Sequence, residues 1–256
     1  MAHTLRLGEL TREDVRELAP HATVILPTAS TEQHGPHLPL STDTLLGEAV
    51  ALRAAELASA EVPVVVAPVL NVGISGHHLF SCALSLRSST YLAMLNDVAD
   101  SLVTSGFKRI FILNSHGGND EVVKLLAKEL VLRHEVAVAA GGYWELAESA
   151  ILKAGGEQVG RLPGHSGGFE TAMVMAVAPE LVREDRMPAS DPQPAPIFAR
   201  GIAKGLVVQK HGEWARSGGY TDAPTRASAE AGKILLDAIS RAVAGAIVAF
   251  HRASGS

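Results

Sequence analysis

Four short apolar runs alternate with longer amphipathic stretches, and this alternation constrains the fold more than any other feature of the chain. The runs cover residues 23–27, 62–69, 109–113 and 135–140. Each is as long as a β-strand and lacks a polar face, as expected for a strand buried on both sides. Strands that alternate with helices are typical of a parallel sheet covered by helices. The sequence therefore predicts an α/β fold with a mostly parallel central sheet.

Helices are predicted where apolar residues recur every three or four positions. One begins near residues 88–90 and ends at Gly106, a second covers about 118–133, and a third lies near the end of the chain. The apolar face of the third helix consists of Leu235, Ile239, Val243, Ile247 and Phe250. Residues 187–196 include four prolines, which exclude a helix or central strand and predict a loop. Because no repeat or low-complexity tract divides the chain, residues 1–256 are predicted to form one domain.

Charge and cysteine content exclude several classes of protein. The chain has 22 Lys and Arg against 27 Asp and Glu, a formal net charge of −5, so it has no basic excess to bind nucleic acid. A single cysteine, Cys82, excludes an internal disulfide and a zinc site of several thiolates; a reducing, cytoplasmic setting is the simplest interpretation. The first residues do not resemble a signal peptide, and the longest apolar stretches are about half the roughly 20 residues of a membrane helix. We therefore expect neither nucleic acid nor a membrane as partner.

The densest polar segment, STEQHGPHLPLSTD at residues 30–43, directly follows the first predicted strand. Ligands of open α/β sheets bind at the carboxyl ends of the strands, so this segment lies where a site is expected. Glu32, His34 and Asp43 offer carboxylates and an imidazole, a donor set for a divalent transition metal. The same residues could instead belong to a polar surface loop.

A second cluster, NSHGGND at residues 114–120, follows the third predicted strand. His116 again falls at the carboxyl end of a strand, and Gly117 and Gly118 allow close approach of the backbone to a ligand. A phosphate-binding loop at the next helix is the competing interpretation, although the spacing of the known phosphate motifs is absent.

A third cluster, GHSGGFETA at residues 164–172, opens another predicted helix. Glu170 falls in the first turn, where a carboxylate either stabilises the helix dipole or binds a metal. His165 precedes the helix, and the chain holds 11 histidines in all. Lone residues such as His78, Trp144 and His211 are more often packing or surface positions; we retain His78 and Trp144 as pocket lining.

Five segments in one order resemble motifs of the creatininase-type amidohydrolases, a family that includes creatinine amidohydrolase and the creatininase-like peptidase of mycofactocin maturation. The segments are STEQHGPHLPLSTD, GISGHH, NSHGGND, GHSGGFETA and GGYTDAPTRAS. The resemblance implies a single-domain three-layer αβα sandwich, a homohexamer and two divalent metal ions at the carboxyl ends of the strands.

By the same resemblance, each functional residue receives a role. Glu32, Asp43 and His116 would hold one ion, while His34 and Asp43 would hold the other. Creatinine hydrolases complete the second site with a carboxylate at the position of Gly118, and Glu170 is the candidate to replace it here. His165 is assigned to proton transfer, with Glu170 as a further catalytic residue. The substrate would contact His78, Gly117, Gly118, Asn119 and Trp144.

A hydroxide shared by the two ions would attack the carbonyl of an amide, and the ions would be zinc, manganese or iron. We expect a metal-dependent amidohydrolase that acts on a small amide, either a cyclic amide such as a lactam or a formamide. Phe80 to Ser85 depart from the family pattern, which indicates an unfamiliar substrate. A mycofactocin-type peptidase and a keto-inositol ring hydrolase are alternatives within the family. A small-molecule-binding module on the same fold and an inactive structural subunit are the non-enzyme alternatives.

Overall fold

A computed structural model of the chain describes residues 5–197, 203 and 206–255. Its sheet has four parallel strands in the order β2-β1-β3-β4. The strands are β1 (Thr23–Thr28), β2 (Val64–Val66), β3 (Arg109–Asn114) and β4 (Ala137–Gly142). Thr23 is paired with Val64 on one side and with Arg109 on the other. Both the α/β class and the parallel sheet predicted from the sequence are confirmed.

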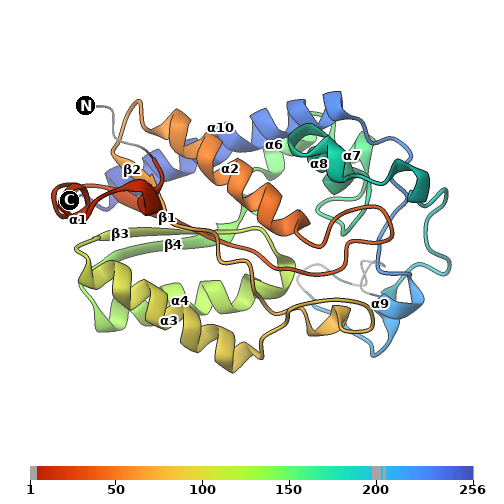
Figure 1. Cartoon of the computed structure of the whole chain (residues 1–256), viewed down its shortest axis with the longest axis horizontal. Helices are drawn as coiled ribbons and strands as arrows, with labels where there is room; N and C mark the ends of the chain where they lie inside the picture. Colours follow the sequence, from red (N-terminus) through yellow and green to blue (C-terminus); the bar gives the residue numbers. More distant parts are fainter. Residues whose placement is uncertain (1–4, 198–202, 204–205, 256) are drawn as a thin grey trace.

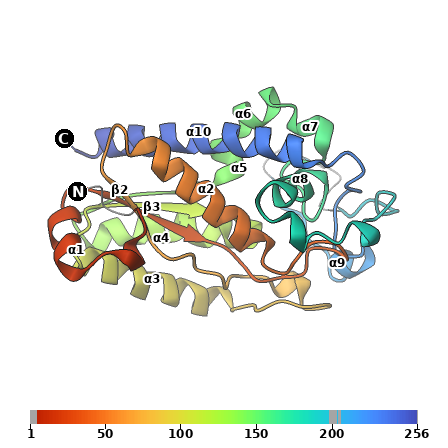
Figure 2. The same cartoon turned by 45° about the horizontal axis from the view of Figure 1, so that its top comes forward.

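Helices cover both faces of this sheet, which gives three layers (Figure 1). The α-helices are α1 (Arg12–Leu18), α2 (Thr42–Ala58), α3 (Ser88–Thr104), α4 (Asp120–Arg133), α5 (Tyr143–Leu146), α6 (Glu148–Lys153), α7 (Gly156–Val159), α8 (Gly168–Val177), α9 (Glu213–Arg216) and α10 (Ala229–Ala253). Short 3-10 helices include η2 (Gly76–His78) and η3 (Gly117–Asn119). Figure 2 shows α2 and α10 on one side of the sheet and α3 and α4 on the other. Residues 187–196 contain neither helix nor strand.

Alternate side chains of the central strands supply the two hydrophobic cores. Ile25 of β1 packs into the core with α2, α8 and α10, whereas Val24 and Leu26 pack into the core with α3 and α4. All three side chains are almost completely buried. A strand that is apolar on both faces therefore requires a helical layer on each side, as the sequence pattern indicates.

The edge strand β4 differs from the expectation of burial on both faces. Residues 137–140 are only half-buried, because β4 pairs with β3 alone and has no strand on its other side. Small side chains such as Ala139 and Ala140 are compatible with this exposure. The helix α3 ends as predicted, since Gly106 adopts a φ of +104°, a left-handed conformation that terminates helices.

The long helix α10 has the length and apolar composition of a membrane span, the only such helix in the described part of the chain. It packs on α2 and α8, and Leu235, Ile239 and Val243 are completely buried there. Its serine cap, Ser228, accepts a hydrogen bond from the amide of Ala231. These contacts are those of a core helix in a globular domain.

The strand order places a topological switch point between β1 and β3. The chain leaves β1 toward β2 on one side, and it leaves β3 toward β4 on the other, so the segments after β1 and β3 diverge. Open α/β sheets bind their ligands in the crevice between such segments. The first two polar clusters of the sequence flank this crevice.

Candidate metal centre

Three separate segments meet at the carboxyl ends of β1 and β3. Glu32 and His34 lie on the segment after β1, Asp43 lies in the first turn of α2, and His116 follows β3. The start of α8 brings Glu170 to the same place. All five residues are buried, with Glu170 the most exposed at 8%. The residues predicted as metal ligands therefore form one cluster.

Asp43 lies at the centre of this cluster. Its Oδ1 is 3.1 Å from Nε2 of His34, and its Oδ2 is 3.0 Å from Nδ1 of His116. On the far side of His34, Oε2 of Glu170 lies 3.7 Å from the same Nε2. One carboxylate thus faces two imidazoles through its two oxygens, as a ligand that bridges two ions would.

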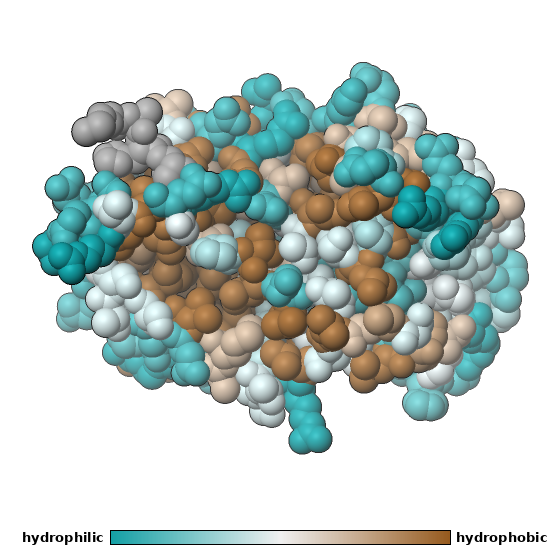
Figure 3. Space-filling view, in the orientation of Figure 1, coloured by the Kyte–Doolittle hydropathy of each residue, from teal (hydrophilic) through white to brown (hydrophobic). Residues whose placement is uncertain are grey.

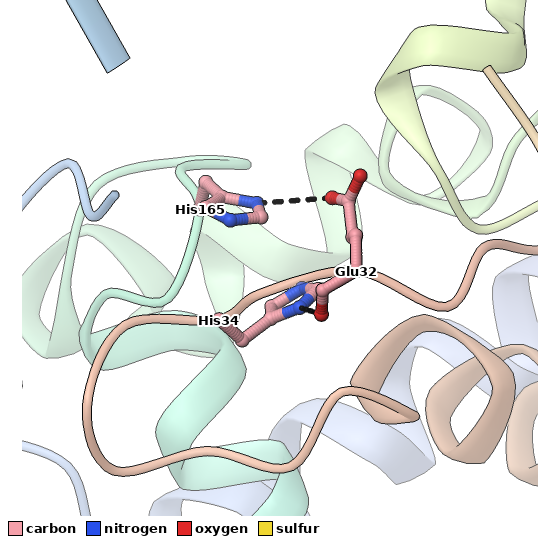
Figure 4. Close-up of side chains that lie close together, drawn as sticks. All are labelled: Glu32, His34 and His165. Atoms are coloured by element: carbon pink, nitrogen blue, oxygen red, sulfur yellow. Dashed lines mark hydrogen bonds and ion pairs between the residues drawn. The ribbon is translucent and has the colours of Figure 1, made fainter. Parts of the chain in front are cut away.

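Glu32 faces several imidazoles with one oxygen. Its Oε1 lies 3.4 Å from Nδ1 of His116 and 3.6 Å from Nδ1 of His165. Figure 4 shows the ring of His165 directed at the Glu32 carboxylate, with the ring of His34 beside the backbone carbonyl of Glu32. Neither carboxylate oxygen of Glu32 makes a hydrogen bond.

In His34 and His116, one ring nitrogen faces the carboxylates (the inner nitrogen) and the other faces a backbone carbonyl (the outer nitrogen). The hydrogen bond of the outer nitrogen determines whether the inner nitrogen carries a proton or a lone pair. Nδ1 of His34 lies 3.1 Å from the carbonyl oxygen of Glu32 (Figure 4), and Nε2 of His116 lies 3.1 Å from that of Ile74. A carbonyl only accepts, so in each neutral ring the outer nitrogen carries the proton. The inner nitrogen then presents a lone pair to the carboxylates. Such anchoring by a backbone carbonyl is typical of histidines that bind metals.

Buried lone pairs that face one another require a proton or a metal cation between them. Both oxygens of Glu32, Nε2 of His34 and Oδ2 of Asp43 are buried and make no hydrogen bond. Among the described residues, four sets of three ligand atoms lie within 4.8 Å of one another. Two sets share Asp43: one is Glu32, Asp43 and His116, and the other is His34, Asp43 and Glu170. The other two sets join Glu32 to His34 and His165, and Glu32 to His77 and His78. These mixed nitrogen and oxygen sets suit zinc, manganese or iron.

Glu170 reaches the second set from the first turn of α8. Its Oε2 accepts a hydrogen bond of 2.5 Å from the backbone amide of Ser166. Ser166 adopts a φ of +52°, an unusual conformation for a residue other than glycine. A Cβ at Gly118 would lie 2.2 Å from the carbonyl oxygen of Ile74, so a carboxylate there would disturb the anchor of His116. The geometry is therefore consistent with Glu170 in place of a ligand at position 118.

Burial and charge shift the pKa values of the cluster in opposite directions. Burial lowers the pKa of His34, but the carboxylates of Asp43 and Glu170 outweigh it and raise the pKa to about 10. Burial raises the pKa of Glu170 to about 7, an effect to which the charge of Asp43 adds. Burial lowers the pKa of His78 to about 2 and that of His165 well below its usual value. The metal-free centre therefore holds protons on its inner histidines, while His78 and His165 are neutral.

A cavity of about 1050 Å³ opens onto the carboxylates. Of the expected substrate contacts, Gly117, Gly118 and Trp144 line it, and so does the catalytic candidate His165. His78 and Asn119 are completely buried and are not among the residues that line the cavity, so their contact with a substrate stays a prediction. The amide of Asn119 bonds the backbone of Ile74 and Ala29 and so joins two loops.

Three residues of the site were not predicted from the sequence to have a role there. Trp214 of α9 lines the cavity, and its ring centroid lies 4.6 Å from that of His78 and 5.2 Å from that of His165. Tyr143 also lines the cavity and is buried. Asp222 accepts hydrogen bonds from the backbone amides of Arg161 and Gly168, which fixes the segment that carries His165. Asp222 lies in the GGYTDAPTRAS segment, so only its role was missed.

Comparison with known proteins identifies the family. The family model described as creatininase, creatinine amidohydrolase, matches residues 8–247. The chain belongs to the creatininase family. Its membership makes it a hydrolase of carbon–nitrogen bonds, so the non-catalytic binding module is not supported.

Members of the creatininase family resemble the chain over most of its length. It is 32% identical to the mycofactocin precursor peptide peptidase of Mycobacterium ulcerans (strain Agy99), over 79% of this chain and 77% of that protein. It is 28% identical to the creatinine amidohydrolase of Pseudomonas putida, over 96% of this chain and 97% of the other. A crystal structure of creatinine amidohydrolase matches the whole of both chains with a TM-score of 0.79 and 26% identity. Two further creatininase structures, with TM-scores of 0.77 and 0.78, are described as manganese and Zn-Zn forms.

Proposed function

We propose that this member of the creatininase family is a metal-dependent amidohydrolase that hydrolyses a carbon–nitrogen bond in a small amide, either a cyclic amide or a formamide. One observation carries the proposal: His34 and His116 face three buried carboxylates, and both oxygens of Glu32 and Oδ2 of Asp43 make no hydrogen bond. A site with that arrangement is complete only when cations occupy it.

We assign two ions to this centre. Glu32, Asp43 and His116 would hold the first, and His34, Asp43 and Glu170 the second, so that Asp43 bridges them. Zinc and manganese are supported by the described forms of the solved relatives, and iron by the donor set alone. When bound, such a pair of ions polarises an amide carbonyl and lowers the pKa of water toward neutrality.

The protein's own residues would move the proton and hold the substrate. His165 lines the cavity, and its Nδ1 faces Glu32, so it can take up a proton and return it to the departing nitrogen. The backbone of Gly117 and Gly118 borders the same space and can orient the carbonyl. Trp144 and Trp214 supply aromatic walls that exclude water from the reacting bond.

A substrate screen tests the activity. Purified protein loaded with Zn²⁺ or Mn²⁺ is offered lactams, hydantoins, formamides and short peptides, and the released amine or acid is measured. We expect turnover of a lactam, hydantoin or formamide that disappears after chelation and returns with added metal. Full activity of the chelated protein would contradict the proposal.

Hydrolysis of a short peptide is the second candidate. The 32% identity to a mycofactocin precursor peptide peptidase favours it, as does the cavity of about 1050 Å³, which has room for more than one small ring. The same screen separates the two candidates, because a peptidase would cleave the peptides and leave the lactams intact.

We also propose that the chain forms a homo-oligomer, with the hexamer as the expected assembly. Apolar side chains gather in the middle of one face, between α2 and α3 (Figure 3). An apolar patch on an enzyme of this size is typical of a protein interface. Light scattering coupled to size-exclusion chromatography should give the mass of six chains, and a monomer would contradict the proposal.

A further inference from the structure

The side-chain amide of Gln33, between the candidate ligands Glu32 and His34, has a fixed orientation. It is 5% exposed. Its Oε1 accepts a hydrogen bond of 2.9 Å from the backbone amide of Gly35, and its Nε2 donates one of 3.0 Å to the carbonyl of Gly219. A backbone amide only donates and a carbonyl only accepts, so the oxygen and nitrogen of Gln33 cannot be exchanged.

The second hydrogen of this amide determines the tautomer of His78. Nε2 of Gln33 lies 2.8 Å from Nδ1 of His78. An amide nitrogen is only a donor, so Nδ1 of His78 accepts this bond and carries no proton. The neutral ring therefore carries its proton on Nε2. His78 thus presents a proton to the carboxylates, whereas the neutral rings of His34 and His116 present lone pairs.

The proton on His78 faces a candidate metal ligand. Nε2 of His78 lies 3.4 Å from Oε1 of Glu32, an oxygen that also lies 3.4 Å from Nδ1 of His116. Neither Nε2 of His78 nor Oε1 of Glu32 makes a hydrogen bond with the described residues. Neighbouring rings hold His78 in this position: His165 stacks on it with centroids 4.3 Å apart, and Trp214 meets it edge-on at 4.6 Å. His78 is completely buried and contacts the centre.

The same amide also determines the proton of His165. Nε2 of His165 lies 3.1 Å from Nε2 of Gln33 and 2.9 Å from the carbonyl oxygen of Gln33. Because both amide hydrogens of Gln33 already have acceptors, Nε2 of His165 donates to that carbonyl. Its Nδ1 is then the basic nitrogen that faces Glu32.

We propose that Gln33 and His78 are positioning residues of the metal centre: Gln33 fixes His78 as the Nε2-protonated tautomer, and His78 donates that proton to Glu32 to hold its carboxylate toward His116. His78 is thus neither a metal ligand nor a substrate contact. The inference rests on the proposed metal centre. Loss of such an outer hydrogen bond typically lowers metal affinity 10- to 100-fold.

The tautomer is tested on the metal-free protein, without reference to activity. Nitrogen-15 NMR of histidine-labelled protein should show His78 neutral and protonated at Nε2. Gln33→Glu replaces the donor with a carboxylate acceptor, so we expect a proton on Nδ1 of His78 in that variant. A wild-type ring protonated at Nδ1, or a tautomer that does not respond to Gln33→Glu, would overturn the assignment.

Metal affinity tests the positioning role. Titration calorimetry with Mn²⁺ should give a 10- to 100-fold weaker first site for His78→Phe, which fills the space but lacks the donor. His78→Gln places an amide N–H near the position of Nε2 and should bind within a few-fold of the wild type. His21→Phe, at an exposed histidine, is the control for histidine loss.

The outcomes separate this inference from the proposed function. Equal affinity of wild type and His78→Phe would overturn the positioning role while leaving the metal centre intact. No binding of Mn²⁺ or Zn²⁺ by the wild type would overturn both the metal centre and the positioning role, and the NMR result would still decide the tautomer. Thermal unfolding of each variant shows whether a loss of affinity comes from a loss of fold.

Discussion

Nδ1 of His116 lies 3.0 Å from Oδ2 of Asp43, yet Oδ2 makes no hydrogen bond. In the neutral ring of His116 the proton is on the other nitrogen, which donates to the carbonyl of Ile74. Two buried acceptors at this distance repel unless a cation or a proton lies between them. This pair joins the segment after β3 to the start of α2, so the cation site depends on the switch point of the sheet.

Metal affinity should rise with pH, because an ion must displace the protons of the metal-free centre. Nearby carboxylates overcome the effect of burial and raise the pKa of His34 from 6.5 to about 10. The stabilisation from protonated His34 is therefore complete below about pH 6.5 and is lost as the pH rises through about 10. Chelator competition should show affinity rising up to about tenfold per pH unit for each proton displaced between about pH 6 and pH 9. An affinity independent of pH would contradict this.

His165→Ala should remove proton transfer but keep both ions. We expect kcat to fall about 10²- to 10⁴-fold, as for loss of a general acid or base, with unchanged metal content. The exposed His21→Ala is the control and should retain wild-type activity. Loss of an ion from His165→Ala would instead identify His165 as a ligand.

Substitution of two adjacent glycines should have unequal effects. A Cβ at Gly118 would lie 2.2 Å from the carbonyl oxygen of Ile74 and 2.5 Å from Nε2 of His116, whereas a Cβ at Gly117 meets nothing within 4 Å. Gly118→Ala should therefore lower the unfolding free energy by about 1–3 kcal/mol and weaken metal binding, and Gly117→Ala should do neither. Chemical denaturation and metal titration measure both effects.

Gly118→Glu should fail to strengthen the second metal site. An increase in the affinity of that site would refute the assignment of Glu170 as its ligand.

Trp214→Ala should weaken substrate binding without loss of metal. The indole borders the cavity and contacts His77, His78 and His165, so its removal opens one wall. Aromatic contacts of this kind contribute about 0.5–1.5 kcal/mol, which corresponds to an increase in KM of up to about tenfold. Trp214→Phe keeps an aromatic wall, so its KM should lie between that of the wild type and that of Trp214→Ala. Equal KM values for Ala and wild type would show that the indole does not contact the substrate.

The fold and the ligand cluster could be predicted because they depend on local patterns. Buried central strands require apolar residues on both faces, as Val24 and Ile25 show, and strands that alternate with helices determine a parallel sheet. The ends of β1 and β3 then bring Glu32 and His116 to one edge of the sheet. The positions after the strands placed these residues at one edge of the sheet, whereas their roles as metal ligands came from the resemblance to the creatininase family.

The remaining features depend on contacts between segments that are distant in the sequence. The orientation of His78 toward Glu32 depends on the amide of Gln33, 45 residues earlier. Trp214 enters the cavity from α9, and no local pattern relates it to the clusters near residues 32 and 116. The half-buried face of β4 likewise follows from its place at the sheet edge, which the sequence of one strand does not specify.

Metal content of the wild type and of Asp43→Asn is the decisive test of the proposed two-ion centre. Asp43 faces both inner histidines, so its replacement should remove both ions and lower activity by roughly 10³-fold or more, beyond the loss typical of an outer hydrogen bond. Elemental analysis of wild-type protein equilibrated with Zn²⁺ or Mn²⁺ should give two ions per chain, against none for Asp43→Asn. A wild-type protein without bound metal, or an Asp43→Asn variant that retains both ions, would contradict the proposed centre.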